Sequence, residues 1–529
     1  MSQGEDQPAH YYLAGGGIAS LAAAVFLIRD AGVSGEQVTI FEKEDRFGGS
    51  LDGAGDAETG YLVRGGRMFE PNFVCTFDLL NSIPCGLPGG LPGGLSAKED
   101  IFAFNRDVPG SSQCRLIRDG AKADTRLGLR LRDMRDLARL TQADEKKLDG
   151  KAIDECFDPA FFQSNFWIMW STMFAFQTWH SAIELARYLK RFIHLFPGFT
   201  RMEGVLRTRF NQYDSLIAPI LDWLTERGVK FETEATVIDA TVSETGDTSC
   251  ISALLLERAG QSEIIPVSEH DRVFFTLGSM TANSVQGSNT APPPAPETDS
   301  AWTLWKTLAA KSPIFGRPDV FCPDVTRTRW ESFTVTLKTP AFVEYMERFS
   351  GNRIGTGGLV SIADSGWMLC FVMFHPPHFR QQADGTYVFW GYGLLGDRDG
   401  DYVKKPMAAC TGDEILEELA GQLRLGDQAE AMFRDAIVRP CIMPLITSQF
   451  MPRRAGDRPE VVPEGARNYA CLGQYCEQKH DVVFTVEYSV RSAMTAVHRL
   501  AGGKAPPPVK RTDRNPIVIA NALRTILAG

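Results

Sequence analysis

Glycines and one carboxylate near the N-terminus have the types and the spacing to bind a phosphate-bearing nucleotide. A short apolar stretch, Tyr11 to Ala14, runs into three consecutive glycines, and an alanine-rich stretch with helical periodicity follows. Gly15 suits a tight turn, and Gly17 lets the backbone approach a pyrophosphate at the positive end of the new helix. Ser20 stands where the usual fingerprint has its last glycine and is small enough to keep this helix close to the strand. The pattern predicts a dinucleotide-binding turn.

The residues after this turn narrow the choice of dinucleotide. A second predicted strand, Val38 to Phe41, ends in Glu42, whose carboxylate would accept hydrogen bonds from ribose hydroxyls and disfavour a 2′-phosphate. The following Arg46 to Gly49 resembles the continuation of this motif in large flavoproteins, in which a glycine pair lies beside the diphosphate of FAD. The resemblance favours FAD over NAD. From this region we expect these residues to bind FAD: Gly15, Gly17, Ala19, Ser20, Glu42, Gly49 and Ser50.

Several longer motifs carry a more specific resemblance. They are RGGRMFEP at 64–71, MFAFQTWHSAIELARY at 173–188, FNQYDSL at 210–216, GTGGLVSIADSGW at 355–367, VFWGY at 388–392 and TSQFMPR at 447–453. In this order they resemble the oleate hydratase family, also known as the myosin-cross-reactive antigen family, from about Tyr11 to Leu500. The resemblance implies addition of water to the cis-9 double bond of unsaturated fatty acids such as oleate, giving a 10-hydroxy acid. It also implies a requirement for FAD, most active when reduced, without net redox change.

A proton donor is the first group that such a reaction needs. Hydration of an isolated alkene delivers a proton to one carbon while water approaches the other, and carbocation character develops between them. The family assigns the proton donor to a tyrosine, and Tyr188 occupies its position at the end of the second motif. A phenol has a pKa of about 10, so a nearby cation or the reduced flavin would have to favour its ionised form. Tyr213 is the reserve candidate.

The water-binding group is where the chain departs from the family. The family's water-orienting glutamate belongs to an RGGRE loop, and here Met68 takes its place. A thioether cannot act as a base, so this assignment does not transfer. Glu70 offers a carboxylate in the same loop, which would either face water or form a structural ion pair. Alternatively, the water is held by backbone carbonyls, polar side chains and the flavin, without a general base. We expect Arg67 to contact the flavin or to gate it.

The substrate carboxylate also needs polar partners at the end of an apolar tunnel. TSQFMPR offers Thr447 and Gln449 for this, although a hydrogen-bonded turn would use the same residues. His180 and His194 lack the cysteine or carboxylate spacing of a metal site, so we predict no metal.

The elements that must position these residues predict an α/β fold. A discontinuous Rossmann-like FAD-binding domain is expected from residues 1–83, 226–280 and 455–502. Two strands in 229–242 and one in 271–279 would return to its sheet, bringing Ser279 to the cofactor. A strand, a glycine turn and a long helix after Phe484 would complete it, with Phe484 and Thr485 at the helix end that faces the flavin.

Two excursions are predicted to form an α+β substrate-binding domain from residues 95–225 and 301–454. Residues 152–196 show helical periodicity with many aromatic rings, which could line an apolar cavity or fill an ordinary core. Strands are expected within 358–362, 367–374 and 387–392. Gly- and Pro-rich stretches at 84–94 and 281–300 are expected to be loops.

Composition limits the partners. The length of 529 residues suggests two or three domains. The net charge of −10 and the lack of a dense basic stripe exclude a nucleic-acid partner. The polar N-terminus and the absence of a long apolar run predict a cytoplasmic protein. The basic C-terminal tail, 503–529, would either touch an anionic membrane or dock on the protein as a helix. Two other functions stay open: an FAD-dependent fatty acid isomerase or desaturase-like oxidoreductase, and a non-catalytic lipid-binding flavoprotein.

Overall fold

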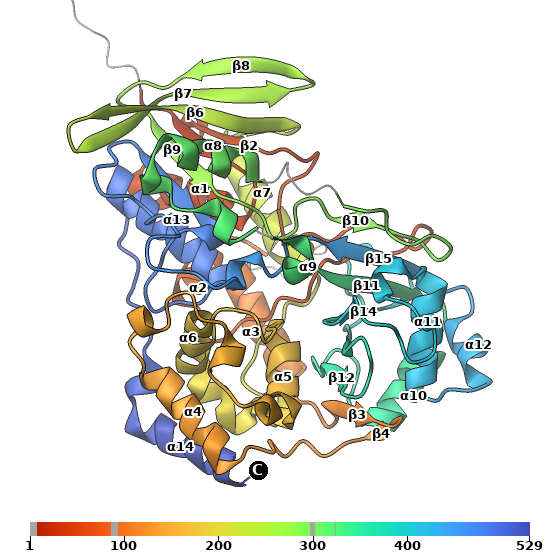
Figure 1. The fold of residues 1–529 in the computed structure, drawn as a ribbon. Helices are drawn as coiled ribbons and strands as arrows, with labels where there is room; N and C mark the ends of the chain where they lie inside the picture. Colours follow the sequence, from red (N-terminus) through yellow and green to blue (C-terminus); the bar gives the residue numbers. More distant parts are fainter. Residues whose placement is uncertain (1–7, 86–93, 297–301, 323, 529) are drawn as a thin grey trace, which may run out of the picture.

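The computed structural model describes residues 8–85, 94–296, 302–322 and 324–528 (Figure 1). Most of the loop predicted at 84–94 and the end of the loop predicted at 281–300 lie outside these residues. No helix within the described ranges is both long and apolar enough to cross a membrane.

A five-stranded sheet forms the centre of the region that contains the glycine turn. Its strand order is β16-β9-β1-β2-β5, and every neighbouring pair is parallel. The strands are β1 (Tyr11–Ala14), β2 (Val38–Phe41), β5 (Lys230–Glu232), β9 (Arg272–Thr276) and β16 (Tyr469–Leu472). This confirms a mixed α/β fold with a parallel sheet. All five strands lie inside the three sequence stretches assigned to the FAD-binding domain, while the limits of that domain stay a prediction.

Two helices pack together beside this sheet. α1 (Ile18–Ala31) is buried over its first ten residues, and its alanines let α13 (Val486–Ala501) approach closely. α2 (Val74–Leu80) packs on α13, and α7 (Ala218–Thr225) packs on α1. Residues from the two ends of the chain thereby meet beside the glycine turn.

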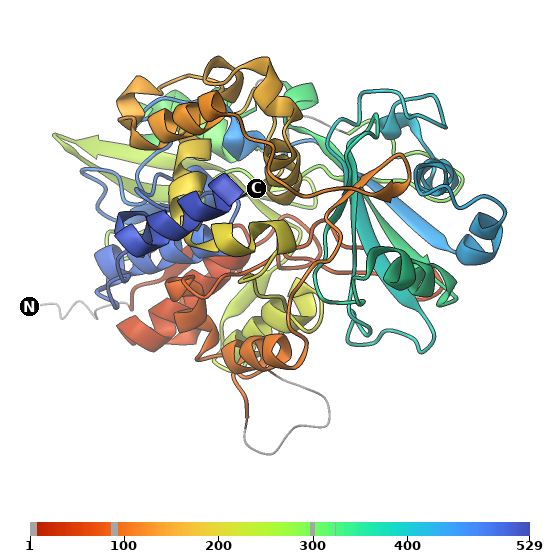
Figure 2. The ribbon, with the colours of Figure 1, turned by 90° about the horizontal axis from the view of Figure 1, so that it is seen from below.

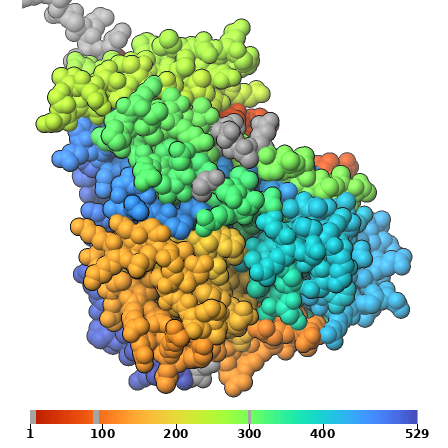
Figure 3. Space-filling view, in the orientation of Figure 1, coloured from red at the N-terminus to blue at the C-terminus, as the bar shows by residue number. Residues whose placement is uncertain are grey.

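One predicted strand leaves the parallel sheet. Of the two strands expected in 229–242, β5 joins the sheet, but Glu234 has a positive φ of 50° and turns the chain outward. The next strand, β6 (Ala235–Thr245), pairs instead with β7 (Thr248–Arg258), which pairs with β8 (Gln261–Pro266). This antiparallel layer lies at the top of the molecule in Figures 1 and 3.

The strands of the two excursions share one sheet of eight. The order is β10-β15-β11-β14-β13-β12-β3-β4, antiparallel except for β12 beside β3. The strands are β3 (Leu116–Arg118), β4 (Ala121–Lys122), β10 (Val285–Gln286), β11 (Trp330–Leu337), β12 (Val360–Ile362), β13 (Leu369–Met373), β14 (Tyr387–Gly393) and β15 (Ile437–Met443). The strands predicted within 358–362, 367–374 and 387–392 are thus confirmed. α10 (Ala341–Ser350), α11 (Gly412–Gln422) and α12 (Gln428–Phe433) contribute to a second apolar core with this sheet.

A helical region faces the eight-stranded sheet (Figure 1). The helical stretch expected at 152–196 is interrupted, because Ala175 adopts a left-handed φ of 61° between α5 (Asn165–Phe174) and α6 (Ala182–Phe192). The remaining helices are α3 (Ala97–Asp107), α4 (Leu131–Gln142), α8 (Thr303–Lys311), α9 (Val325–Thr328) and α14 (Pro516–Ala528). α14 docks on the turns at 193–201, so the C-terminal tail packs on the protein body (Figure 2).

Candidate functional site

A cavity of about 210 Å³ lies at the glycine turn where β1 meets α1. Seven of the residues expected to bind FAD line it: Gly15, Gly17, Ala19, Glu42, Gly49, Ser50 and Ser279. Gly473, Gln474 and Ser489 line it from the C-terminal part of the chain. Segments far apart in the sequence therefore converge on one cavity.

The glycine turn has the geometry of a phosphate cradle. Gly15 takes a φ of +97°, and Gly17 stands at the N-cap of α1 in an extended conformation without a side-chain cap. Gly49 has a φ of +56°, and a Cβ on it would lie 3.2 Å from the Gly17 Cα. The helix therefore presents uncapped N–H groups toward a space that only glycines keep open. These residues fit the diphosphate of a dinucleotide.

Glu42 lies at the end of β2, as the sequence predicts for a ribose-binding carboxylate. Its Oε2 accepts a hydrogen bond from Gly16 N at 2.7 Å, and its Oε1 accepts one from Glu44 N at 2.9 Å. Each oxygen keeps further acceptor capacity toward the cavity. Burial raises the pKa of Glu42, while the two backbone donors oppose that shift.

The other expected cofactor residues are placed differently. Ser20 is fully buried behind the turn, with its hydroxyl 3.1 Å from Thr276 Oγ1, and it supports the turn from behind. Arg67, Phe484 and Thr485 line a second, neighbouring cavity at the start of α13. Thr485 caps this helix by accepting a hydrogen bond from Tyr488 N at 3.2 Å.

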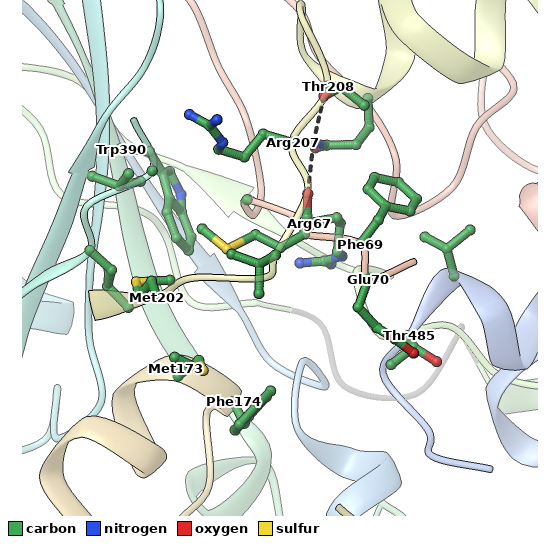
Figure 4. A pocket seen from close by; sticks show the side chains of 18 of the residues that line it. Arg67, Phe69, Glu70, Met173, Phe174, Met202, Arg207, Thr208, Trp390 and Thr485 are labelled. Carbon is green, nitrogen blue, oxygen red and sulfur yellow. Dashed lines mark hydrogen bonds between the residues drawn. The ribbon is translucent and has the colours of Figure 1, made fainter. Parts of the chain in front are cut away.

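The second cavity, of about 180 Å³, is predominantly apolar (Figure 4). Residues from α5, α6, β13, β14 and the loop at 66–70 line it. Of the aromatic residues in 152–196, Phe174, Tyr188 and Phe192 reach the cavity, whereas Phe161, Trp167 and Trp170 are buried in the core. Both interpretations of the aromatic run are therefore correct, each for part of it.

Tyr188 is 1% exposed and points to the start of α13. Its hydroxyl donates a 2.6 Å hydrogen bond to the Val483 carbonyl. Burial, with the carboxylates of Glu184 and Asp481, raises the pKa of Tyr188 well above its usual range, while Arg67 opposes this. The phenol is thus neutral and carries a proton at the cavity wall.

Arg67 is a buried cation beside Tyr188. Its guanidinium lies 5.0 Å from the centre of the Phe484 ring, and its Nη2 has no hydrogen-bond partner. No carboxylate of the described residues forms an ion pair with it. Burial lowers the pKa of Arg67 to about 10, which leaves it charged at neutral pH. The Asp52 carboxylate opposes this shift without forming an ion pair, so a positive charge that is only partly offset acts on the phenol.

Glu70 lines the same cavity and is 1% exposed. Its Oε1 lies 2.5 Å from Arg191 Nη1, and its Oε2 accepts from Asn72 N at 2.9 Å and lies 3.2 Å from His194 Nε2. Burial opposes ionisation, yet the hydrogen bond from His194 and the charge of Arg191 lower the pKa of Glu70. Glu70 is therefore a fixed carboxylate: two hydrogen-bond contacts occupy Oε2, whereas Oε1 is held by the ion pair with Arg191 and has no hydrogen-bond partner.

Met68 lines the cavity beside these groups but brings no polar atom. Gln212 Nε2 donates to the Arg67 carbonyl at 3.2 Å and lies 3.3 Å from Thr208 Oγ1 (Figure 4). The reserve candidate Tyr213 packs instead against Arg46, whose guanidinium lies 4.2 Å from its ring centre.

The residues expected to bind the substrate carboxylate do not line either cavity. Thr447 Oγ1 donates to the Thr328 carbonyl at 2.9 Å, and Gln449 Nε2 donates to the Ile446 carbonyl at 3.1 Å. Both side chains are buried in the hydrogen-bonded turn that the sequence offered as the alternative. Their assignment to the substrate stays a prediction.

The cavity contains polar residues that the sequence analysis missed. Arg207 lies on the opposite side from Glu70 and Thr485 (Figure 4). Burial lowers the pKa of Arg207 to about 10. Its Nη1 donates to the Gly355 carbonyl and its Nη2 to the Val108 carbonyl, whereas its Nε has no partner and no described carboxylate pairs with it. His375 and His378 line the same region. The signal was available as the RTR run at 207–209 and the HPPH run at 375–378, but neither identifies a cavity by itself.

No cluster of three His, Cys, Asp or Glu side chains within the described chain is placed to hold a metal ion. His180 is fully buried with its Nδ1 accepting from Gln177 N at 2.9 Å, and burial lowers its pKa to about 3. It is a core histidine.

Comparisons with known proteins agree with the motifs. A protein-family model described as the MCRA family matches residues 9–498. The chain is 38% identical over 517 residues to an oleate hydratase of Streptococcus pyogenes serotype M49 (strain NZ131), covering 95% of this chain and 86% of that protein. It is 33% identical over 557 residues to a linoleate hydratase of Lactiplantibacillus plantarum, covering 96% of this chain and 97% of the relative. Among solved structures, one from Pyrococcus furiosus matches with a TM-score of 0.50 and 12% identity, over 95% of this chain and all of that one, which concerns the fold alone.

Proposed function

The chain belongs to the MCRA family, and from this premise we propose that it is a fatty acid hydratase that adds water to the cis-9 double bond of oleate or a similar acid. The observation that carries the proposal is the apolar cavity in which a neutral phenol, a buried cation and a fixed carboxylate meet. The relatives named for hydration of oleate and linoleate support the same substrate class.

FAD is the cofactor that we propose for the cavity at the glycine turn, with the enzyme most active when the FAD is reduced. The glycine turn, Glu42 and Gly49 fit a diphosphate and a ribose, and residues in the first turn of α13 line both cavities. Bound there, the flavin would supply an electrostatic surface at the reacting carbons, since hydration has no net electron transfer.

Tyr188 is the proposed proton donor. The phenol would give its proton to one alkene carbon, water oxygen would bond to the other carbon, and a water proton would return to the phenolate. The raised pKa keeps the proton on Tyr188 until the alkene takes it. The nearby charge of Arg67 would then stabilise the phenolate.

Glu70 is the proposed partner of the attacking water. Its Oε1, which has no hydrogen-bond partner, can accept from a water, and its negative charge favours the developing carbocation. Met68 contributes apolar surface only, so it is a lining residue in this proposal.

Arg207 is the proposed partner of the fatty-acid carboxylate, in preference to Thr447 and Gln449. A buried cation without a counter-charge, placed across an apolar cavity from the reacting groups, fits an anionic headgroup. His375, with an unpartnered Nδ1, lies beside it. The chain of the substrate would then run along the apolar wall toward Tyr188.

The C-terminal helix offers a peripheral membrane contact for such an insoluble substrate. Ile517, Leu523 and Leu527 on α14 are 69%, 52% and 69% exposed, and Arg514 and Arg524 lie on the same segment. Binding to vesicles with anionic lipid, lost in Leu523→Glu, is the expected outcome.

Product analysis in heavy water tests the proposed reaction. The purified protein with reduced FAD should convert oleate to a hydroxy acid with one carbon-bound deuterium and no double bond. A product with a moved or added double bond would instead identify the isomerase or desaturase activity. Binding of oleate and flavin without any product would identify a lipid-binding protein.

A further inference from the structure

A contact between the C-terminal segment and the candidate catalytic carboxylate extends the site beyond the cavity wall. His194, in the turn after α6, lies between the two with its side chain 16% exposed. On one side its Nε2 is 3.2 Å from Glu70 Oε2. On the other side its Nδ1 is 3.2 Å from the hydroxyl of Thr512, which precedes α14.

The chemistry of the neighbours assigns the roles of the ring nitrogens. Two groups lie 3.2 Å from His194 Nε2: the Glu70 carboxylate, which is ionised and can only accept, and Asn72 Nδ2, which can only donate. The charge-assisted bond to Glu70 is the stronger of the two, so His194 Nε2 carries a hydrogen and donates it to the carboxylate. In the neutral ring Nδ1 is then an acceptor, and Thr512 donates its hydroxyl hydrogen. The bond from Thr512 selects the tautomer that Glu70 needs, because the other tautomer would place a nitrogen lone pair against the carboxylate.

The position of the Glu70 carboxylate depends on this bond. Arg191 holds one carboxylate oxygen and His194, with Asn72 N, holds the other. Loss of the His194 bond would let the carboxylate rotate about its remaining partners and change the direction in which Oε1 points.

We infer that His194 is a positioning residue for Glu70, and that the Thr512 hydroxyl of the C-terminal segment holds the His194 ring in the tautomer that Glu70 needs. The geometry thus makes the docked tail a part of the site and gives it a role besides surface contact. The inference rests on the proposed function through the role of Glu70.

Kinetics of oleate hydration by full-length variants test the link. Thr512→Val keeps the shape and removes the hydroxyl, and it should lower kcat about 3- to 10-fold, the factor expected for one hydrogen bond, with KM for oleate unchanged. Thr512→Ser should restore kcat, because it restores the donor. Thr525→Val is the matched control, since this hydroxyl of α14 bonds only the Asn521 carbonyl of its own helix at 3.1 Å, and it should leave kcat unchanged.

A double variant separates positioning from a general effect on folding. In a Glu70→Gln background, Thr512→Val should lower kcat no further, because both changes act on one group. Either of two results overturns the inference alone. One is an additive loss of kcat in the double variant; the other is a wild-type kcat in Thr512→Val while Glu70→Gln is impaired. A fully active Glu70→Gln overturns it together with the role of Glu70, and leaves the hydratase activity standing.

Amide hydrogen exchange of residues 512–528 checks the same link without turnover. Coupling between two sites is reciprocal, so Glu70→Gln should speed exchange in this segment relative to wild type. Unchanged exchange contradicts the link. If the wild type forms no hydroxy acid, the proposed function fails while this measurement still decides whether the tail and Glu70 are coupled.

Discussion

Replacement of Tyr188 by phenylalanine is the most direct test of the proton donor. The change removes one hydroxyl and keeps the ring that packs edge-on against Phe174 and Phe176, each with ring centres 5.0 Å apart. The apolar wall is therefore preserved, and KM for oleate should change less than about threefold. Turnover should fall by about 10²- to 10⁴-fold, the usual contribution of a positioned general acid.

The same change has a separate and smaller cost in stability. The Val483 carbonyl loses the donor that lies 2.6 Å from it, and a buried acceptor without a partner costs about 1–3 kcal/mol. The loss of turnover corresponds to about 3–5 kcal/mol in the activation barrier, so partial unfolding of a stable protein cannot reproduce it.

Tyr392 provides a matched control for Tyr188→Phe. It is 3% exposed, lines the same cavity and donates its hydroxyl to the Thr172 carbonyl. Tyr392→Phe thus removes an equivalent buried hydrogen bond without removing the proposed acid. Initial rates of 10-hydroxy acid formation, with flavin content and unfolding measured in parallel, give the comparison. Turnover of Tyr188→Phe within tenfold of wild type, or an equal loss in Tyr392→Phe, would refute the assignment.

The cofactor cradle, the carboxylate partner and the buried histidine give three further tests. Gly49→Ala should lose flavin absorbance on purification, because its Cβ would lie 3.2 Å from the Gly17 Cα. Gly32→Ala is the control: Gly32 has a similar φ of +69° with open space around it, so this variant should keep its flavin absorbance. Arg207→Gln should raise KM about 10- to 100-fold for oleate but not for oleyl alcohol, as expected for loss of one charged hydrogen bond; equal effects on both would contradict the assignment. His180 has a folded pKa of about 3, below its unfolded value of about 6.5, so it lowers stability as the pH falls below 6.5. Between pH 6 and 4 the unfolding free energy of His180→Asn should therefore fall less steeply than that of wild type, by up to about 1.4 kcal/mol per pH unit, and equal slopes would contradict this.

Local patterns predicted the parts of the site that one segment builds alone. The glycine turn, the strand before it and the helix after it are neighbours in sequence, so Gly15 and Gly17 could be placed from spacing. Most of the motif that contains Tyr188 lies within the three turns of one helix, α6, so local spacing was enough to predict Tyr188 as a site residue. Within such segments backbone geometry alone decides which side chains share a face.

Contacts between distant segments could not be predicted in this way. Glu70 and His194 are 124 residues apart, and His194 and Thr512 are 318 apart. Thr447 donates a hydrogen bond to the Thr328 carbonyl, 119 residues away, and this contact holds the Thr447 side chain in the core. The departure of β6 from the parallel sheet depends on one left-handed residue, Glu234, that no periodicity reveals.

The exchange of the loop glutamate for Met68 changes the electrostatics that any mechanism must use. A carboxylate at this position would offset the charge of the adjacent Arg67, but a thioether does not, and no described carboxylate pairs with Arg67. The charge of Arg67, which Asp52 offsets only from a distance, favours ionisation of Tyr188 after proton transfer and disfavours a carbocation nearby. Glu70, held ionised by Arg191 and His194, supplies the opposite charge from a second position on the wall. Different residues thereby support proton donation and carbocation stabilisation. Arg67→Met should impair proton donation by Tyr188, and Glu70→Gln should impair stabilisation of the carbocation.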